Sequence, residues 1–297
     1  MIEPSITREQ RIKRIQNYIF QMPNLSTTVT KVLEICNNPK TSPNDLNRVI
    51  SLDPVLTGKV LTLINSAYYS LPKEVTSLTR AIIMLGLNTV RNLALSTAVL
   101  ESFGRKESFP ALSIDEFWSH SLCVGVTAKS LAAIKGVRIT EREEYFVAGL
   151  LHDLGKIPLN RCFPDEYVQT LELAKLEQDT LDRAENMIFG FDHCSVGKMI
   201  ADKWHLSEAM NDSLRHHHNV DDVKEENREM VAMVALADTY ANILEKGLPG
   251  APGSEDPVLA YLLEQVGISW HVLADLNETV LSEIEKAKIF LQFTERS

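Results

Sequence analysis

Apolar residues recur along most of this 297-residue chain at the three- and four-residue spacing of an α-helix. Near the N-terminus, for example, Val29, Val32, Leu33 and Cys36 would share one face of a helix. The sequence has no long run of alternating apolar and polar residues, and it lacks the Asn-Gly and Asp-Gly pairs typical of tight hairpins. The pattern therefore predicts an all-α protein.

Polar residues with capping side chains mark where several predicted helices begin. The expected caps are Ser42, Asp53, Asn88, Asp115 and Thr140, which precede helices ending near residues 50, 64, 101, 135 and 155. Thr140 also fits a capping box with Glu143. Another helix is expected from Ser77 to Leu85. Further helices are predicted at roughly residues 165–177, 180–189, 193–204, 207–218, 227–245, 256–266 and 270–293.

The helices group into three parts of the chain. Residues 1–104 should form an N-terminal lobe of short helices, and the stretch 105–114, with its charges and proline, is the candidate boundary. Residues 115–246 should form a second helical lobe. After a predicted Gly/Pro-rich loop at 247–253, residues 254–297 form a helical C-terminal extension. In the first lobe, Tyr68 and Tyr69 are expected to pack between lobes, or the segment around them could line a groove for a partner.

Composition narrows the class of protein. The hydrophobic fraction is 44% and the charged fraction 24%, which is ordinary for a folded domain. There is no apolar run of membrane-spanning length and no apolar leader, so we expect a cytoplasmic protein that does not cross a membrane. The net charge is −10, and residues 111–297 carry 32 acidic against 17 basic side chains. This balance disfavours binding to nucleic acid, which depends on lysine and arginine, but supplies carboxylates that could hold cations.

The four cysteines are far apart in the sequence, at positions 36, 123, 162 and 194. They form no CxxC pair, so the spacing does not support a zinc ribbon or a thioredoxin-like site. We expect reduced thiols that act as small buried apolar groups.

The pair His152-Asp153 is the sharpest chemical feature of the sequence. It follows the apolar residues Leu150 and Leu151, and burial of a carboxylate in such surroundings is costly unless a cation compensates it. Imidazole and carboxylate together suit Zn, Mn or Fe, and a carboxylate can bridge two ions. The alternative is a simple helix-end turn beside a core histidine.

Other histidines and aspartates occur in similar helical contexts. They are His120, His193, the run His216–His218, and Asp238, while Glu116 lies one helical turn before His120. Neighbouring helices of a bundle could bring these side chains together around metal ions. His205 and His271 are expected to be ordinary histidines outside any site. Successive helical residues point about 100° apart, so the run 216–218 can serve one ion only if its helix has ended there.

The order of these motifs is similar to that of a known family. His120, His152-Asp153 and Asp238 resemble the H…HD…D signature of the HD phosphohydrolase superfamily. Residues 22–25, 50–54, 59–69 and 81–91 resemble the HDOD (HD-related output domain) family, and the similarity covers about residues 20–220. This resemblance implies an N-terminal helical lobe packed on an HD-type helical bundle, and a regulatory or signalling role in bacteria.

The resemblance also implies a dinuclear metal site, with ligand positions similar to those of HD-GYP phosphodiesterases. His120, His152, Asp153 and Asp238 match one metal's ligands, whereas Asp153 as a bridge with His193, His217 and His218 matches the other's. Glu116 matches a glutamate seen in some members, and Lys156 matches the lysine of an HDxGK motif. The GYP portion is missing after His218, which argues against cyclic di-GMP as a substrate.

Two functions follow as expectations. The first is a signalling protein whose two divalent transition-metal ions, iron before manganese or zinc, bind or sense a phosphate-containing small molecule or report to a protein partner. The second is a metal-dependent phosphohydrolase or phosphodiesterase, in which Asp153 and Lys156 would be catalytic and Lys156 would offer its charge to a phosphate oxygen.

Overall fold

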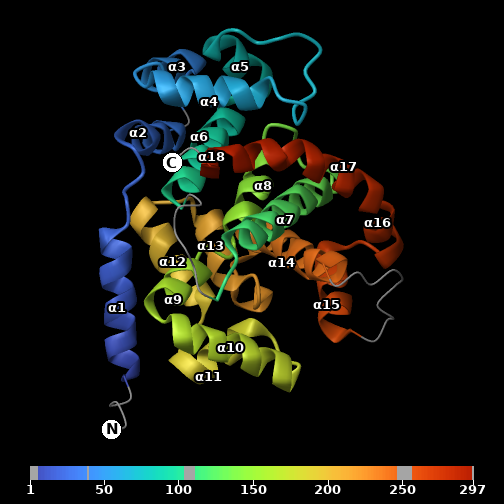
Figure 1. Ribbon diagram of the computed structural model, residues 1–297. Coiled ribbons are helices and arrows are strands. Elements are labelled where there is room, and N and C mark those ends of the chain that lie inside the picture. Colours follow the sequence, from blue (N-terminus) through green and yellow to red (C-terminus); the bar gives the residue numbers. More distant parts are fainter. Residues whose placement is uncertain (1–5, 39, 104–110, 246–255, 296–297) are drawn as a thin grey trace.

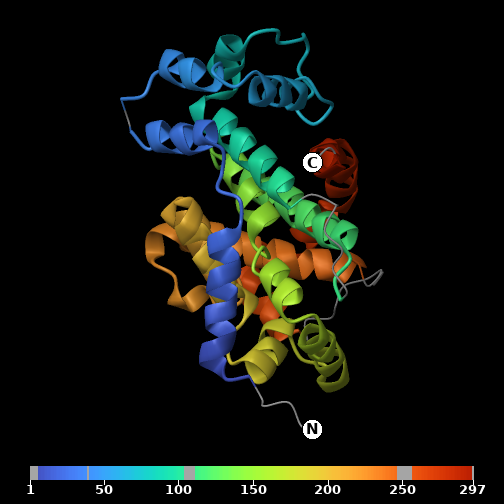
Figure 2. The same ribbon diagram turned by 60° about the vertical axis from the view of Figure 1, so that its left-hand side comes forward.

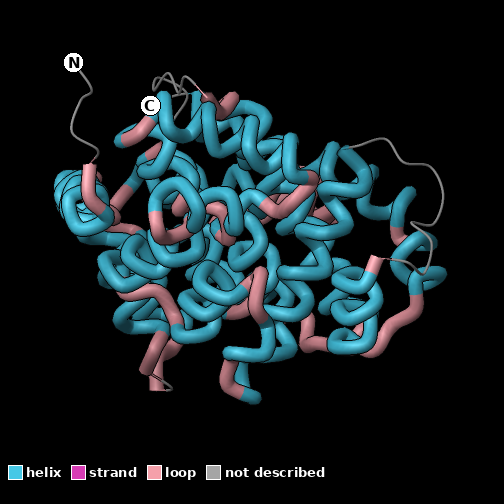
Figure 3. Tube along the Cα trace, turned by 90° about the horizontal axis from the view of Figure 1, so that it is seen from below, coloured by secondary structure: helices cyan, strands magenta, loops and turns pink. Residues whose placement is uncertain are grey.

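The computed structural model describes residues 6–38, 40–103, 111–245 and 256–295, and every regular element among them is a helix (Figure 3). The prediction of an all-α fold is confirmed. The first helices are α1 (Arg8–Gln21), α2 (Thr27–Cys36), α3 (Pro43–Ile50), α4 (Pro54–Ile64), α5 (Leu78–Leu85) and α6 (Leu87–Ser102). They are followed by α7 (Ile114–Ile134), α8 (Arg142–Leu151), α9 (Lys156–Cys162), α10 (Pro164–Glu177), α11 (Leu181–Phe189), α12 (His193–Trp204), α13 (Glu208–His216), η1 (Val220–Asp222) and α14 (Glu225–Glu245). The C-terminal elements are α15 (Pro257–Val266), α16 (Trp270–Asp275), α17 (Asn277–Ala287), η2 (Lys288–Leu291) and α18 (Gln292–Glu295).

Helix starts follow the predicted caps at Ser42 and Asp53, whose side chains accept hydrogen bonds from the first turns of α3 and α4. Other predicted starts were wrong by a few residues. Ser113, not Asp115, caps α7 and accepts from Glu116 N–H. Helix α8 begins at Arg142 without a side-chain cap, so the predicted capping box of Thr140 does not form.

Gly86 sets the sharp corner between α5 and α6, which are bent by 116°. Its φ of +90° is a conformation that side chains with a Cβ rarely adopt, so one glycine ends α5 and begins α6. Helix α6 therefore starts at Leu87, before the predicted cap Asn88. Among the described residues, no single helix is long and apolar enough to cross a membrane; this bent pair passes the test of length and composition, which buried core helices also pass.

Two further differences from the sequence prediction concern continuity. Helix α8 ends at Leu151, and the short helix α9, which the sequence pattern did not indicate, starts at Lys156 after a turn. The single helix expected at 270–293 is broken into α16, α17, η2 and part of α18. The predicted loop 247–253 and most of the predicted boundary 105–114 lie outside the described residues.

Helix α7 packs against α8 and α14 of the predicted second lobe and against α17 of the predicted C-terminal extension (Figure 1). At its crossing with α8, Gly125 faces Gly149 so closely that a Cβ added to Gly149 would lie 2.8 Å from Gly125 Cα. The absence of both side chains lets the two backbones approach each other. This contact fixes the positions from which α7 and α8 present their histidines.

Helix α1 packs on α9 and α12, away from α2–α6, as Figures 1 and 2 both show. The ammonium of Lys203 in α12 donates to the carbonyls of Ile19 and Met22, each at 2.7 Å, and so caps the end of α1. Arg11 donates to the carbonyl of Ile188 at 2.8 Å. Although α1 belongs to the predicted segment 1–104, it is thereby tied to the second lobe.

The remaining N-terminal helices contact the second lobe through an aromatic and charged cluster. Lys129 of α7 donates to Tyr68 Oη at 2.9 Å and to Glu143 Oε2 at 2.7 Å. The rings of Phe146 and Phe290 pack on Tyr68 with centroids 5.5 and 5.4 Å away. Tyr68 therefore packs between lobes, as one of the two interpretations predicted, and the C-terminal η2 contributes to the same contact.

Alanine at position 149 is expected to destabilise the protein, because its Cβ would meet backbone atoms of Gly125 that cannot move aside as a flexible side chain could. Overpacking of this kind costs about 1–3 kcal/mol, which urea denaturation of Gly149→Ala would measure. Gly58→Ala is the matched control, since nothing lies within 4 Å of its added Cβ. That variant should be as stable as the parent or gain about 0.5–1 kcal/mol. Equal stability of the two variants would contradict the role assigned to the glycine contact.

Candidate metal centre

The predicted metal ligands come from the ends or faces of five helices and lie close together in the structure. His120 lies on α7 and Asp238 on α14, while His152 directly follows α8. Helix α12 begins with His193, and α13 ends at His216, so His217 and His218 follow the helix rather than continue it. The end of α13 is what allows two successive histidines to reach the same space.

The carboxylate of Asp153 lies at the centre of these side chains and is 1% exposed. Its Oδ2 faces His152 Nε2 at 3.3 Å and His120 Nε2 at 3.8 Å. Its Oδ1 faces the opposite way, toward His193 Nε2 at 3.2 Å and His217 Nε2 at 3.7 Å. The two oxygens thus separate two groups of nitrogen atoms, which is the arrangement expected of a bridging carboxylate.

The first group contains His120, His152 and Asp153, whose ligand atoms lie within 4.8 Å of one another. Asp238 adjoins it, with Oδ1 3.1 Å from His120 Nε2 and 3.7 Å from His152 Nε2. Two imidazoles and two carboxylates offer nitrogen and oxygen atoms to one ion, a donor set that suits iron, manganese or zinc.

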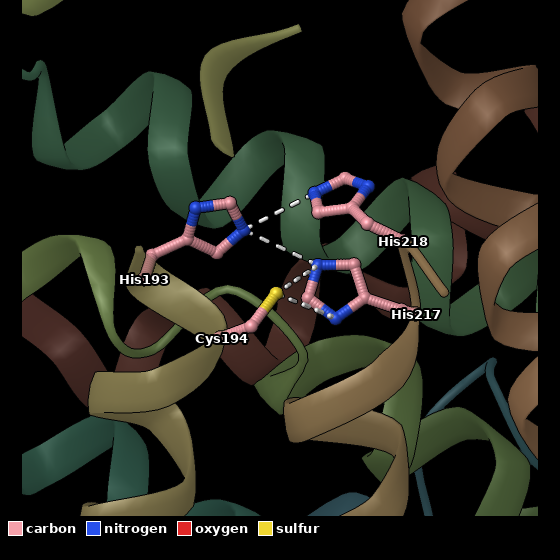
Figure 4. Close-up of side chains that lie close together, drawn as sticks. All are labelled: His193, Cys194, His217 and His218. Carbon is pink, nitrogen blue, oxygen red and sulfur yellow. Dashed lines mark hydrogen bonds between the residues drawn. The ribbon is translucent and has the colours of Figure 1, made fainter. Parts of the chain in front are cut away.

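The second group contains His193, Cys194, His217 and His218, again with ligand atoms within 4.8 Å (Figure 4). His193 Nε2 lies 3.3 Å from His217 Nε2 and 3.2 Å from His218 Nε2. The thiol of Cys194, which the sequence analysis treated as a small apolar group, lies 3.8 Å from His217 Nε2. These four residues could hold a second ion.

Hydrogen bonds at the outer nitrogens orient the imidazole rings. Nδ1 of His152 donates to the carbonyl of Gly149 at 2.7 Å, and Nδ1 of His217 donates to the carbonyl of Ser213 at 3.0 Å. Nδ1 of His193 donates to Glu185 Oε2 at 2.6 Å. Each bond engages the proton on Nδ1, so that Nε2 of the neutral ring would be free to bind a metal ion, which is how outer partners commonly prepare metal ligands.

Two buried polar atoms at the centre of the cluster lack hydrogen-bond partners and are placed as metal ligands would be. His152 Nε2 and Asp153 Oδ1 are buried without a hydrogen-bond partner. Since buried polar groups are seldom left unpaired, these two atoms need a partner of another kind. Two cations, one on each side of Asp153, would satisfy both atoms and the adjacent Nε2 lone pairs.

The pKa values of the cluster reflect its mixture of charges. Burial alone would raise the pKa of Asp153, but His152 and Lys156 hold it well below its usual value. Burial opposes protonation of His120, yet hydrogen bonds to Asp238 and Glu245 raise its pKa to about 10. A metal ion bound by His120 Nε2 must displace a proton there.

Lys156 and Gly155 complete the turn after Asp153. The ammonium of Lys156 pairs with Asp153 Oδ2 at close hydrogen-bonding distance. A Cβ added to Gly155 would lie 1.9 Å from the carbonyl oxygen of His193. Only glycine therefore allows the start of α12, which carries His193, to approach the turn that carries Asp153.

Some of the residues that contact the cluster differ from those that the sequence predicted. Glu116 is exposed, and the carboxylate that contacts His120 Nδ1, at 2.9 Å, belongs to Glu245. Glu185 and Cys194 contact the cluster as well, and nothing in the local sequence of Glu185 distinguishes it. Cys194 is adjacent to His193, and that adjacency was the one available signal.

A pocket of about 360 Å³ opens beside the cluster and gives it access to solvent. His217, His218 and Asp238 line its inner side. Its other walls include Arg183 near the start of α11 and Tyr261 of α15, whose hydroxyl donates to Asp221 at 2.6 Å. The C-terminal extension thus forms part of the entrance to the candidate centre.

The helical bundle and its carboxylate-centred histidine cluster define an HD-type protein, as the sequence resemblance implied. The HDOD domain family matches residues 22–220, and the chain belongs to this family.

Similar proteins have been found among solved structures and curated sequences. An HDOD domain protein of unknown function from Geobacter sulfurreducens has a TM-score of 0.73 and 27% identity, over 96% of this chain and 99% of that one. A candidate phosphohydrolase from Shewanella amazonensis SB2B has a TM-score of 0.70, covering 94% and 98% of the two chains, and at 22% identity shows the fold alone. An uncharacterized protein of Treponema pallidum (strain Nichols) is 24% identical over 79% of this chain, which spans only 45% of that relative's length.

Removal of the Glu185 side chain should destabilise the protein even in the presence of a chelator. Its buried Oε2 accepts from the backbone N–H of His193 at 2.7 Å as well as from His193 Nδ1. Each buried donor left unpaired costs about 1–3 kcal/mol, so Glu185→Ala should lose at least about 2 kcal/mol in urea denaturation. Glu185→Gln keeps an acceptor oxygen for these donors and should lose clearly less. Similar losses in both variants would show that bulk, rather than hydrogen bonding, explains this buried glutamate.

Proposed function

We propose that this HDOD protein binds two divalent transition-metal ions at the Asp153 cluster and, through them, a phosphate-containing small molecule as part of a signalling role. The observation that carries the proposal is the opposed placement of two ligand groups on the two oxygens of one buried carboxylate. Iron is the first expectation for the ions, and manganese and zinc suit the same ligands.

The residues of the site support recognition of an anion. The two aspartates contribute two negative charges, so two divalent ions would leave the cluster cationic. Lys156 lies beside Asp153, and Arg183 lies in the wall of the pocket. A phosphate group entering the pocket would therefore meet positive charge at its inner end, next to His218 and Asp238, although the surrounding lobe is acidic.

Purified protein without a histidine tag is expected to contain about two equivalents of transition metal by elemental analysis. Asp153→Ala should lose both ions, because the carboxylate contributes one oxygen to each group. Glu116→Gln is the control, since this exposed side chain is outside the cluster and its loss should leave the stoichiometry unchanged. One equivalent retained in Asp153→Ala would contradict the bridging role.

The metal-loaded parent protein and the Asp153→Ala variant also test whether the site binds phosphate. Inorganic phosphate should raise the melting temperature of the metal-loaded parent protein, because a ligand that binds only the folded state stabilises it. It should leave Asp153→Ala unchanged. A metal-loaded protein indifferent to phosphate would refute phosphate recognition while leaving metal binding intact.

Hydrolysis of the bound phosphoester is the second candidate function, and the pocket that reaches the ligands favours it. Metal ions supply a water of lowered pKa and polarise phosphoryl oxygens. The contribution of the chain is to orient the substrate in the pocket and to place the ammonium of Lys156 near the centre, where negative charge would develop.

An active enzyme should hydrolyse a generic aryl phosphodiester in the presence of Mn(II), and Lys156→Ala should slow the reaction by roughly 10²–10³-fold, as for the loss of one electrostatic donor. The release of the aryl alcohol provides the assay, with Asp153→Ala as the inactive control. Equal rates for the parent and Asp153→Ala would eliminate hydrolysis and leave ligand binding as the function.

A further inference from the structure

The thiol of Cys194 distinguishes the second ligand group from the first. Cys194 follows His193 in the first turn of α12 and is buried, with 5% of its surface exposed. Its Sγ lies 3.8 Å from His217 Nε2, and it belongs to the same group of mutually close ligand atoms as the three histidines. Among the described residues, the other three cysteines belong to neither group.

A second observation, independent of the cysteine, points to a cation in this group. Asp153 Oδ1 is buried without a hydrogen-bond partner, and it is directed at His193 Nε2 and His217 Nε2. Both histidines donate from Nδ1 to other partners, so in the neutral rings the Nε2 lone pairs would face each other at 3.3 Å. Lone pairs and a carboxylate oxygen that converge on one point repel each other unless a cation lies between them.

We infer that Cys194 is a thiolate ligand of the second ion, so that the two halves of the centre differ in chemistry. The inference rests on the proposed dinuclear site and deepens it. The first half offers His120, His152 and two carboxylates, which suit iron or manganese. The second half offers three imidazoles and one sulfur, a set that favours zinc.

The two halves then have different roles. Three imidazoles, a thiolate and the bridging Oδ1 of Asp153 would leave a zinc ion no open position, as in the closed sites that stabilise structure. Zinc at the second half would join the start of α12 to the end of α13 and would neutralise Asp153 Oδ1. An exogenous anion would then bind mainly to the ion in the first half, whose ligand Asp238 lines the pocket.

Cobalt(II) titration of the full-length, tag-free, chelator-treated protein tests this assignment. A thiolate ligand gives Co(II) a strong near-ultraviolet charge-transfer band, whereas nitrogen and oxygen ligands alone do not. We expect the band to saturate at one equivalent while a second equivalent binds without adding to it. Cys194→Ser should abolish the band and weaken binding of Zn(II) at that half by more than about 10-fold, since loss of even an outer partner costs about 10–100-fold. Cys162→Ser, a buried cysteine outside both groups, should keep the band.

X-ray absorption of the zinc-loaded parent protein provides a measurement that depends on no variant. A sulfur scatterer at about 2.3 Å from zinc is expected, beside nitrogen at about 2.0–2.1 Å. Two bound ions with neither the band nor the sulfur scatterer would overturn the role of Cys194 and leave the dinuclear site standing. A protein that binds no cobalt or zinc would overturn the proposed function itself, and the cysteine ligand with it.

Discussion

The buried charge of Asp153 is the constraint on which the rest of the centre depends. A carboxylate that is 1% exposed must be compensated, and the fold provides histidines from α7, α8, α12 and α13, together with the ammonium of Lys156. Each of these histidines is itself held by a further hydrogen bond, such as that from His193 to Glu185. The centre is therefore built around one buried carboxylate, and metal ions would supply the positive charge that its surroundings favour.

Close backbone contacts make this arrangement possible. Gly125 and Gly149 let α7 approach α8, and Gly155 lets the start of α12 lie against the turn after Asp153. Precise placement of ligands requires rigid support, and glycine at a crossing provides it by removing the side chains that would separate two helices. The same glycines have no chemical role of their own, so their importance is visible only in the packed structure.

The elements outside the matched family region also contribute to the site. Asp238 comes from α14, and α15 contributes Tyr261 to the pocket wall. Through η2, the C-terminal extension also packs its Phe290 against Tyr68, which lies at the contact between lobes. The same C-terminal segment therefore contacts both the pocket, through Tyr261, and the N-terminal helices, through Phe290.

The sequence by itself determined the all-α class, many helix ranges and the family, because helical periodicity, caps and the His-Asp motif are local signals. It also named the histidines and aspartates that meet at the centre, through the resemblance of their order to a known pattern. Only the tertiary structure decided that Glu245 rather than Glu116 contacts His120, that Glu185 supports His193, and that Cys194 faces His217. These contacts join residues from separate helices, or depend on the direction of one side chain at a helix start. Spacing along the chain carries no information about either until the helices are packed.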